Sequence, residues 1–403
     1  MAEYTLVEYD EETYRPGEPT DEQNPERMPE DVAETLWKEA SKQVEVELPS
    51  IQTGGKIKLK NRGYAGRVKL PGGHSVVLEP KVQVERVLRL LRYAEGLESF
   101  EFLDRLYAAD TIDKFYDAVV EELASGVIKR QRKGLYQEYV DRKEKSEVVR
   151  GKIDFREASK KPWEPELPIE YTELTPDIED NQILLWTLFV ARSSGIASDD
   201  VKGKVRRAYQ SLAGMVSLEQ YRASDCLGRD YQRLNKGYER LHVLCHIILS
   251  QSGPVRGSGA NQMVPWAVDM ETLYERVVAN WLDDRLEDPL SVESQEEVEI
   301  GDSGREFEVD LVFYRDGEPI AVADTKYKVP EKPSTSDISQ VISYAKTRGV
   351  ERACLIYPER LEEPINTDVN GVRIETLKFG LAGELGDEGS DFLTEMRLPM
   401  LVS

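Results

Sequence analysis

The sequence predicts an α+β chain of several domains: a small N-terminal β-rich module, a central helical region and a C-terminal α/β domain. Short alternating apolar runs broken by glycines occupy residues 44–82, whereas apolar residues recur at helical spacing through most of 84–255. After a segment rich in glycine and serine at 252–262, the pattern becomes helix, strand, strand, helix, strand. We therefore expect domains at 1–83, 84–255 and 256–403.

The N-terminal part combines an acidic stretch with the alternating runs. Residues 10–32 are rich in acidic residues and proline, which predicts a surface loop or a mobile segment. A helix is expected at about residues 30–43. The runs that follow it, separated by glycine pairs, predict the small β-rich module.

The composition limits the class of protein and its surroundings. The chain has 403 residues, with 76 acidic and 53 basic ones, for a formal net charge of −23. Such an acidic excess argues against non-specific binding of nucleic acid in ordinary salt. It also suits a protein adapted to high salt, where the Debye length falls to about 3 Å at 1 M. We favour a halophilic source. In high salt the net charge of the protein does not indicate whether it binds nucleic acid or another partner.

No segment of the sequence resembles a signal peptide or a membrane span. The N-terminus lacks a basic region followed by an apolar core, and no run of about 18 apolar residues occurs. Cys226, Cys245 and Cys354 form no CxxC pair, which disfavours a disulfide framework or a zinc ribbon. The sequence predicts a cytoplasmic protein with no membrane partner.

The central region is expected to be mainly helical, with one shorter and more extended segment at 150–158. His242 and His246 in its last helix have a spacing that suggests zinc, but the glutamate of an HExxH motif is missing and the neighbouring residues are mostly apolar. Histidines packed within the fold are the better interpretation. Basic stretches at 128–134 and 56–69 could contact phosphate or a partner, although solvated charge is the ordinary alternative.

One helix of the C-terminal part, at 269–284, has an unusually regular apolar face with Asp269 as the expected N-cap. The face comprises Met270, Leu273, Tyr274, Val277, Val278, Trp281 and Leu282. Glu271 and Glu275 lie one turn apart beside it. These two glutamates could reach a site at the edge of the domain or simply face solvent.

Charged residues interrupt the two apolar strands that follow. Asp310 lies in the first strand, 306–314, and Asp324 and Lys326 lie two residues apart in the second, 320–328. Charges inside strands that pack in a core are costly unless they are paired or bind a metal. If Asp310 faces Asp324 across the hairpin, the two carboxylates can share a Mg²⁺ ion. The lysine could then orient a metal-bound water or help to deprotonate it.

The register of this hairpin decides between a metal site and a charged surface. A two-residue Asp-Gly turn would put Asp310 opposite Ala323 and leave Asp324 on the other face. Opposing the two aspartates requires a loop of three or five residues, or a bulge near the site. Because Pro319 cannot donate a ladder hydrogen bond, we expect the longer loop.

If only the hairpin is considered, a solvated sheet face is the alternative to a metal site. In a chain with 32% charged residues Asp-x-Lys matches occur by chance, and 141–143 is another one. The next helix, expected at 337–347, places Gln340 and Tyr344 at positions i and i+4. This arrangement resembles nucleases of the PD-(D/E)xK type, in which a Gln-x-x-x-Tyr helix follows the catalytic strand. In that fold a helix glutamate, here Glu275, often joins the site.

Several blocks along most of the chain resemble the McrC family, the nuclease subunits of the McrBC 5-methylcytosine restriction system. They are GYAGRVKLPGGHSVVLEPKV, VERVLRLLRYAEGL, VVRGKIDF, YTELTPDIEDNQILLWTL and VDMETLYERVVANWL. The Asp-Thr-Lys of the second strand and the Gln-x-x-x-Tyr helix complete the pattern. The resemblance implies a restriction-endonuclease-like C-terminal domain of the PD-(D/E)xK type.

The resemblance also implies a role for each site residue in the Mg²⁺-dependent hydrolysis of DNA. Asp310 and Asp324 would ligate the metal, with the Thr325 carbonyl as a further ligand. Lys326 would position the attacking water. Gln340 would support the site or touch DNA.

A partner is implied as well. Members of the family act with McrB, an AAA+ GTPase hexamer, on which McrC docks with its N-terminal part at the central pore and stimulates GTP hydrolysis. This sequence has no GxxxxGK[ST] motif, so GTP would be bound by the partner and not by this chain. The alternative function is a non-catalytic adaptor that activates an AAA+ NTPase in a defence complex.

Overall fold

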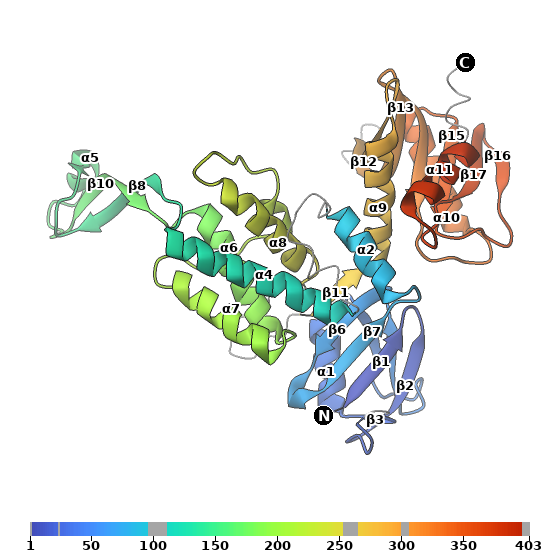
Figure 1. The fold of residues 1–403 in the computed structure, drawn as a ribbon, viewed down its shortest axis with the longest axis horizontal. Coiled ribbons are helices and arrows are strands. Elements are labelled where there is room, and N and C mark those ends of the chain that lie inside the picture. Colours follow the sequence, from blue (N-terminus) through green and yellow to red (C-terminus); the bar gives the residue numbers. More distant parts are fainter. Residues whose placement is uncertain (1, 23–24, 96–110, 253–264, 300–305, 397–403) are drawn as a thin grey trace.

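The structure is a computed structural model that describes five stretches of the chain: residues 2–22, 25–95, 111–252, 265–299 and 306–396 (Figure 1). Strands come first along the chain, long helices follow, and a mixed sheet with helices ends it. This is the α+β organisation that the sequence predicts. None of the helices in the described stretches is long and apolar enough to cross a membrane.

Two four-stranded sheets form the N-terminal module, in the orders β1-β7-β6-β11 and β3-β2-β5-β4. They enclose one apolar core together with helix α1 (Glu30–Glu39). The strands are β1 (Glu3–Val7), β2 (Glu11–Pro16), β3 (Arg27–Met28), β4 (Val44–Glu47), β5 (Ile57–Asn61), β6 (Tyr64–Lys69), β7 (Ser75–Glu79) and β11 (Trp266–Asp269).

The acidic stretch at 10–32 is more ordered than expected, so its prediction as a surface loop is wrong in part. Both β2 and β3 lie within it, and α1 begins near its end. Glu11 of β2 pairs with Lys60 of β5, and its carboxylate lies 3.6 Å from Lys58 Nζ. Opposite charges on neighbouring strands stabilise such a pair, and the composition of one strand alone does not reveal its partner.

Strand β11 comes late in the sequence yet completes an N-terminal sheet. It runs antiparallel to β6, with Val268 opposite Ala65. Gly66 permits the close approach, because a Cβ atom there would lie 2.5 Å from the carbonyl oxygen of Trp266. The predicted linker at 252–262 lies, apart from its first residue, outside the described residues. The chain thus touches the N-terminal module again just before its last helices and strands.

Five long helices make up most of the described part of the middle of the chain. They are α2 (Val84–Ala94), α4 (Ile112–Lys133), α6 (Glu179–Ser194), α7 (Asp199–Leu212) and α8 (Glu239–Ser250), with short 3₁₀ turns at Ala223–Cys226 and Lys236–Tyr238. Their apolar faces share one core cluster with the first helix of the C-terminal part. The helices therefore pack as one body rather than as separate hairpins.

A three-stranded sheet projects from these helices and forms an arm (residues 138–175), at the far left of Figure 1. It contains β8 (Glu138–Ser146), β9 (Lys152–Ile153), β10 (Leu167–Thr175) and the short helix α5 (Phe155–Ala158). The sequence predicted only one extended segment here, at 150–158, and the two long strands were not expected. Most residues of β8 are exposed, so no clear apolar alternation marks it as a strand.

The C-terminal part is a six-stranded mixed sheet in the order β12-β13-β14-β15-β17-β16, covered by helices on both faces. Helices α9 and α11 pack on one face and α10 on the other. The strands are β12 (Leu290–Glu299), β13 (Glu306–Arg315), β14 (Glu318–Thr325), β15 (Arg352–Tyr357), β16 (Asn366–Val369) and β17 (Val372–Lys378). The helices are α9 (Met270–Arg285), α10 (Thr335–Arg348) and α11 (Leu385–Met396).

Helix α9 begins where the sequence predicts. The Asp269 carboxylate accepts hydrogen bonds from the main-chain N–H groups of Glu271 and Thr272, at 3.1 and 3.2 Å. All seven residues of the predicted apolar face are buried. The N-cap and the face together orient the first turns of α9 toward the hairpin of β13 and β14.

Candidate functional site

The hairpin that carries the predicted site turns over two residues. Arg315 of β13 pairs with Glu318 of β14, and Asp316 and Gly317 between them have φ values of 50° and 82°. Positive φ at both central residues suits the right-handed twist of the strands. The prediction of a longer loop is therefore wrong. Asp316 and Gly317 can both adopt the positive φ that this turn requires, and Pro319 fits in β14 next to the turn.

A β-bulge nevertheless provides the alignment that a metal site requires. Next to the turn Tyr314 lies opposite Pro319, but one step further Phe313 lies opposite Ala321, so Ile320 is an extra residue on β14. A bulge was one of the two devices that could bring the aspartates together. The structure confirms that alternative.

Asp310 and Asp324 are neighbours in the shifted register. The last regular pair before them is Leu311 opposite Ala323. Asp310 Oδ2 accepts hydrogen bonds from the main-chain N–H of Thr325 at 2.8 Å and from its hydroxyl at 2.9 Å. These two bonds hold the Asp310 carboxylate against the end of β14, beside the residue that precedes Thr325.

Asp324 is a buried carboxylate next to Lys326. Its side chain is 1% exposed, and Lys326 Nζ lies 2.7 Å from its Oδ2. The contact is an ion pair by distance, but neither oxygen accepts a well-directed hydrogen bond from the described residues. Burial and the charge of Asp310 raise the pKa of Asp324 to about 7, although Lys326 acts in the opposite direction. Ionised Asp324 is therefore costly unless a further cation lies close to it.

Lys326 is held as a cation at the same place. Burial alone would lower its pKa, but the carboxylates of Asp324 and Asp310 outweigh burial and raise the pKa above its ordinary value. Its main-chain N–H donates to the carbonyl oxygen of Ile356 on β15 at 2.8 Å. A protonated lysine is a donor of hydrogen bonds and cannot act as a base.

Helix α9 brings two more carboxylates toward the hairpin. Glu275 Oε1 accepts a hydrogen bond from Gln295 Nε2 of β12 at 3.2 Å. Burial and the charge of Asp310 raise the pKa of Glu275 to about 7. Glu271 keeps much exposed surface, but partial burial raises its pKa, and the charge of Lys326 acts against that shift. Both glutamates are thus electrostatic neighbours of the site.

The predicted Gln-x-x-x-Tyr pair lies on α10, which covers the other face of the sheet. Gln340 Nε2 donates to the Tyr344 hydroxyl at 2.6 Å. Tyr344 is buried in the core between α10 and the strands, and burial is the main cause that raises its pKa. Asp324 contributes to that shift, which places the Tyr344 ring within electrostatic reach of the carboxylate. Among the described residues Gln340 donates to Tyr344 and has no direct hydrogen bond to Asp310 or Asp324.

The oxygen atoms at this edge of the sheet fit a hard divalent cation. Asp310 and Asp324 offer two carboxylates, and the second has buried oxygens without well-directed hydrogen bonds. Across the described stretches, no three His, Cys, Asp or Glu side chains group closely enough to bind a metal. The ligands would therefore be two carboxylates with main-chain and water oxygens, a set that suits Mg²⁺ far better than zinc.

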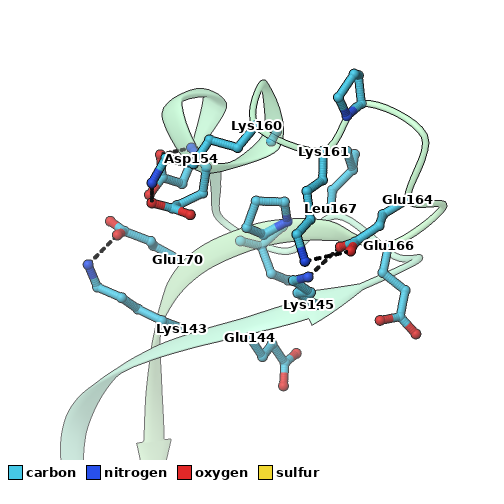
Figure 2. Close-up of a pocket in the computed structure, with 15 residues that line it drawn as sticks. Lys143, Glu144, Lys145, Asp154, Lys160, Lys161, Glu164, Glu166, Leu167 and Glu170 are labelled. Carbon is cyan, nitrogen blue, oxygen red and sulfur yellow. Dashed lines mark hydrogen bonds and ion pairs between the residues drawn. The ribbon is translucent and has the colours of Figure 1, made fainter.

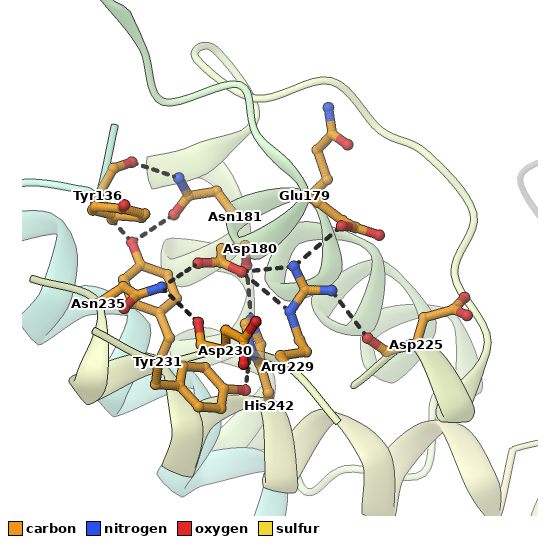
Figure 3. Close-up of polar contacts among 12 residues, drawn as sticks. Tyr136, Glu179, Asp180, Asn181, Asp225, Arg229, Asp230, Tyr231, Asn235 and His242 are labelled. Atoms are coloured by element: carbon orange, nitrogen blue, oxygen red, sulfur yellow. Dashed lines mark hydrogen bonds and ion pairs between the residues drawn. The ribbon is translucent and has the colours of Figure 1, made fainter. Parts of the chain in front are cut away.

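The histidines of the central region pack within the fold, as the sequence predicts. The His242 ring nitrogens lie 2.8 Å from the Tyr231 hydroxyl and 3.0 Å from the main-chain oxygen of Asp180 (Figure 3). Those of His246 lie 2.9 Å from a main-chain oxygen and 3.1 Å from Glu95 Oε2. Both rings are occupied by these contacts, which disfavours a zinc site.

A polar network around α6, which the sequence did not reveal, anchors the arm (Figure 3). Asn181 Nδ2 donates to the carbonyl oxygens of Tyr136 at 3.0 Å and Pro176 at 2.8 Å, which flank β8 and β10. The adjacent Asp180 accepts from Arg229 Nη2 at 2.8 Å. Asn181 lies within the segment YTELTPDIEDNQILLWTL, whose sequence alone does not show that this residue holds both ends of the arm.

The arm exposes several apolar side chains. Tyr139, Phe155 and Trp163 are 74%, 75% and 77% exposed, respectively. The arm also has a pocket of about 430 Å³, lined mostly by charged residues (Figure 2). Its lysines are paired, for example Lys161 with Glu164 at 3.2 Å, so the pocket presents compensated charge. The apolar residues are the more distinctive feature of this surface.

The two basic stretches are partly used inside the fold. Arg67, within 56–69, lies 2.6 Å from Glu3 and 2.8 Å from Asp113. Arg130, within 128–134, stacks over the Tyr238 ring at 5.0 Å. Neither stretch therefore presents all of its cations to a ligand.

Comparison with known proteins agrees with this architecture. A family profile described as McrBC 5-methylcytosine restriction system component matches residues 59–358. Among solved structures, a chain from the Thermococcus gammatolerans assembly of McrB AAA+ hexamers with bound McrC is similar, with a TM-score of 0.57 and 17% identity over 98% of this chain and 100% of that one. At that identity the similarity concerns the fold alone.

A second structure, of the Thermococcus gammatolerans McrBC complex, matches with 19% identity over 69% of this chain and 86% of that one, at a TM-score of 0.43, too low to support a common fold by itself. No curated protein matches the chain. The family profile spans most of the sequence, from the N-terminal module to the strand that follows α10. On that match, the chain belongs to the family of McrBC 5-methylcytosine restriction system components.

Proposed function

We propose that the chain is a Mg²⁺-dependent DNA endonuclease subunit of a modification-dependent restriction system, with a C-terminal domain of the PD-(D/E)xK type. The observation that carries the proposal is the buried Asp324 carboxylate, which lies beside Asp310 and Lys326 without a well-directed hydrogen bond. Membership of the McrBC family supports the biological setting. The arrangement of charges supports the chemistry.

Asp310 and Asp324 would hold the metal, and the Thr325 carbonyl would add an oxygen ligand. When bound, Mg²⁺ supplies positive charge that stabilises a phosphate in the transition state and lowers the pKa of a bound water. Thr325 keeps Asp310 oriented through its N–H and hydroxyl. A cation at this place would also remove the cost of an ionised Asp324 at neutral pH.

Three further side chains complete the proposed machinery. Lys326, protonated and ion-paired with Asp324, positions the attacking water or a phosphate oxygen. Glu275, whose pKa is raised to about 7, can exchange a proton with water near neutral pH. Gln340 holds the Tyr344 hydroxyl and so shapes the wall of the site on the α10 side.

Calorimetric titration with Mg²⁺ tests the metal site directly. The wild type should bind Mg²⁺, and Asp324→Asn should weaken binding at least about tenfold because it removes a charged ligand. Glu375→Gln is the matched control, since Glu375 is also buried in this sheet but is paired with Arg352 at 2.8 Å. Equal affinity in wild type and Asp324→Asn would refute the site.

We also propose that the chain acts with DNA and with an McrB-like AAA+ GTPase hexamer, both of which it would meet in the cytoplasm. The related McrC chain in the solved assembly is bound to McrB hexamers. The arm offers a surface for such a contact, because it projects from the helical body and exposes Tyr139, Phe155 and Trp163. This role does not require the catalytic residues, so it equally supports the alternative of a non-catalytic activator.

A triple change on the arm tests that surface. Tyr139→Ser, Phe155→Ser and Trp163→Ser together should abolish stimulation of an McrB-like GTPase while the thermal unfolding midpoint stays close to that of the wild type. Exposed apolar side chains contribute little to folding, so a large drop in the midpoint is not expected. Unchanged stimulation would exclude the arm as the contact.

A further inference from the structure

A hydrogen bond joins the N-terminal module to the residue that follows Lys326. The Tyr327 hydroxyl donates to Glu8 Oε2 at 3.2 Å. Glu8 is fully buried just after β1, and Tyr327 is 7% exposed just after β14. These two residues come from opposite ends of the chain, so the contact ties the first strand of the protein to the strand that carries the proposed site.

Glu8 is held firmly on the side of the N-terminal module. Its main-chain N–H donates to the carbonyl oxygen of Glu79 at 2.8 Å, and it forms a β-bridge with Asn61. The main-chain N–H of Lys81 donates to the same Oε2 atom that Tyr327 contacts, at 3.1 Å. Contacts within the N-terminal module therefore fix the position of this carboxylate independently of Tyr327.

Tyr327 links that carboxylate to the site. Its ring packs against Tyr274 of α9, with the ring centroids 6.0 Å apart. The preceding residue, Lys326, forms an ion pair with Asp324. A displacement of Tyr327 would therefore move the main chain that positions Lys326 and, one residue earlier, Thr325, whose N–H and hydroxyl hold Asp310.

The surroundings of this contact are not tightly packed. A cavity of about 290 Å³ lies at the junction, lined by Glu8, Lys81, Tyr327, Lys328 and neighbouring residues. Glu8 Oε1 has no hydrogen-bond partner among the described residues. Lys328 lies over the Tyr9 ring at 5.3 Å. Atoms that face a void lose contact partners on that side, so the hydrogen bond to Glu8 is a directed contact that helps to fix the Tyr327 hydroxyl.

We propose that Glu8 is a positioning residue for the nuclease site: by holding the Tyr327 hydroxyl, the N-terminal module fixes the end of β14 and thereby the placement of Asp324 and Lys326. The consequence for cleavage rests on the function proposed above. The N-terminal module then supports the catalytic edge of the sheet in addition to any contact with a partner.

Tyr327→Phe and Glu8→Leu test the proposal, with Tyr116→Phe as the control; leucine has no oxygen to accept from the Tyr327 hydroxyl. The Tyr116 hydroxyl is also buried and lies 2.8 Å from Ser194 Oγ, but in the helical body. In the full chain, both junction variants should speed hydrogen exchange in residues 320–328, and Tyr116→Phe should not. In the assembly with an McrB-like GTPase, both should lower kcat for DNA cleavage about tenfold with KM unchanged, because the reacting groups are displaced and substrate binding is not.

The two variants should also be non-additive, since each removes the same contact. Exchange in 320–328 that stays at the level of the Tyr116→Phe control would overturn the proposal, as would a rise in KM without a fall in kcat. If the wild type cleaves no DNA while exchange in 320–328 still rises in both variants, the nuclease assignment fails and the link between module and strand stands. The two failures are thus distinguishable.

Discussion

Asp324 differs in its surroundings from Glu375, another buried carboxylate of its sheet. Glu375 accepts a hydrogen bond from Arg352 Nε at 2.8 Å, which compensates its charge. Asp324 has an ion pair with Lys326, a like charge on Asp310 and no well-directed hydrogen bond. The cost of ionising it in the absence of metal follows from that difference.

Without metal, stability should therefore depend on the protonation of Asp324. The folded pKa, about 7, lies above the ordinary value of 3.8, so the folded state binds the proton more tightly than the unfolded state does. Its contribution to stability is present below the ordinary pKa and is lost as pH rises through about 7. Asp324→Asn should flatten this part of the profile and become the more stable protein at about pH 8. Thermal unfolding in a chelating buffer measures this, and identical pH profiles would contradict it.

Much of the candidate site could be predicted at the level of residues. Asp310, Asp324 and Lys326 stand out because a charged side chain in an apolar strand is costly unless it is paired or binds a metal. Gln295 and Glu8 could not be found, because each contributes only through a tertiary contact and lies in no motif. Spacing along the chain carries no information about such contacts.

At the scale of elements, the hairpin separates what the sequence could predict from what it could not. The need for Asp310 to oppose Asp324 follows from the alternation of side chains, but a longer loop and a bulge satisfy it equally well. The structure uses a tight turn with a bulge at Ile320. The strands β8 and β10 were missed for a different reason, since a sheet with both faces largely exposed lacks the apolar alternation on which strand prediction depends.

Two glycines in open space should respond to alanine in opposite ways. Gly203 lies within α7, and a Cβ atom there would meet nothing within 4 Å. Gly203→Ala should stabilise the protein by about 0.5–1 kcal/mol through helix propensity. Gly317 is equally open but has a φ of 82°, so Gly317→Ala should destabilise it by about 1 kcal/mol or more. Urea unfolding checks both, and shifts of the same sign would contradict the turn geometry.

At the scale of the whole molecule, the three parts are joined by specific polar contacts. Strand β11 completes an N-terminal sheet immediately before α9. Glu95 at the end of α2 lies 2.8 Å from Arg276 of α9 and 3.1 Å from His246 of α8. With the contact between Glu8 and Tyr327, these links make the C-terminal sheet depend on the rest of the chain for its orientation.

The net charge of −23 should make the stability of the whole chain depend on salt. Repulsion among acidic residues destabilises the compact state, and added salt screens it. The thermal unfolding midpoint should rise by several degrees between low salt and about 2 M KCl. Most of the rise should come below about 0.5 M, where screening is steepest, whereas a salting-out effect would continue evenly. A flat profile would count against adaptation to high salt.

The central claim is that one chain carries both a catalytic site and an independent activating surface. The most direct test is Asp324→Ala in the assembly with an McrB-like GTPase, with DNA cleavage and GTP hydrolysis measured on the same sample. We predict that cleavage falls at least about 100-fold, while partner binding and GTPase stimulation remain at the wild-type level. Cleavage that survives the substitution would contradict the assignment of the active site.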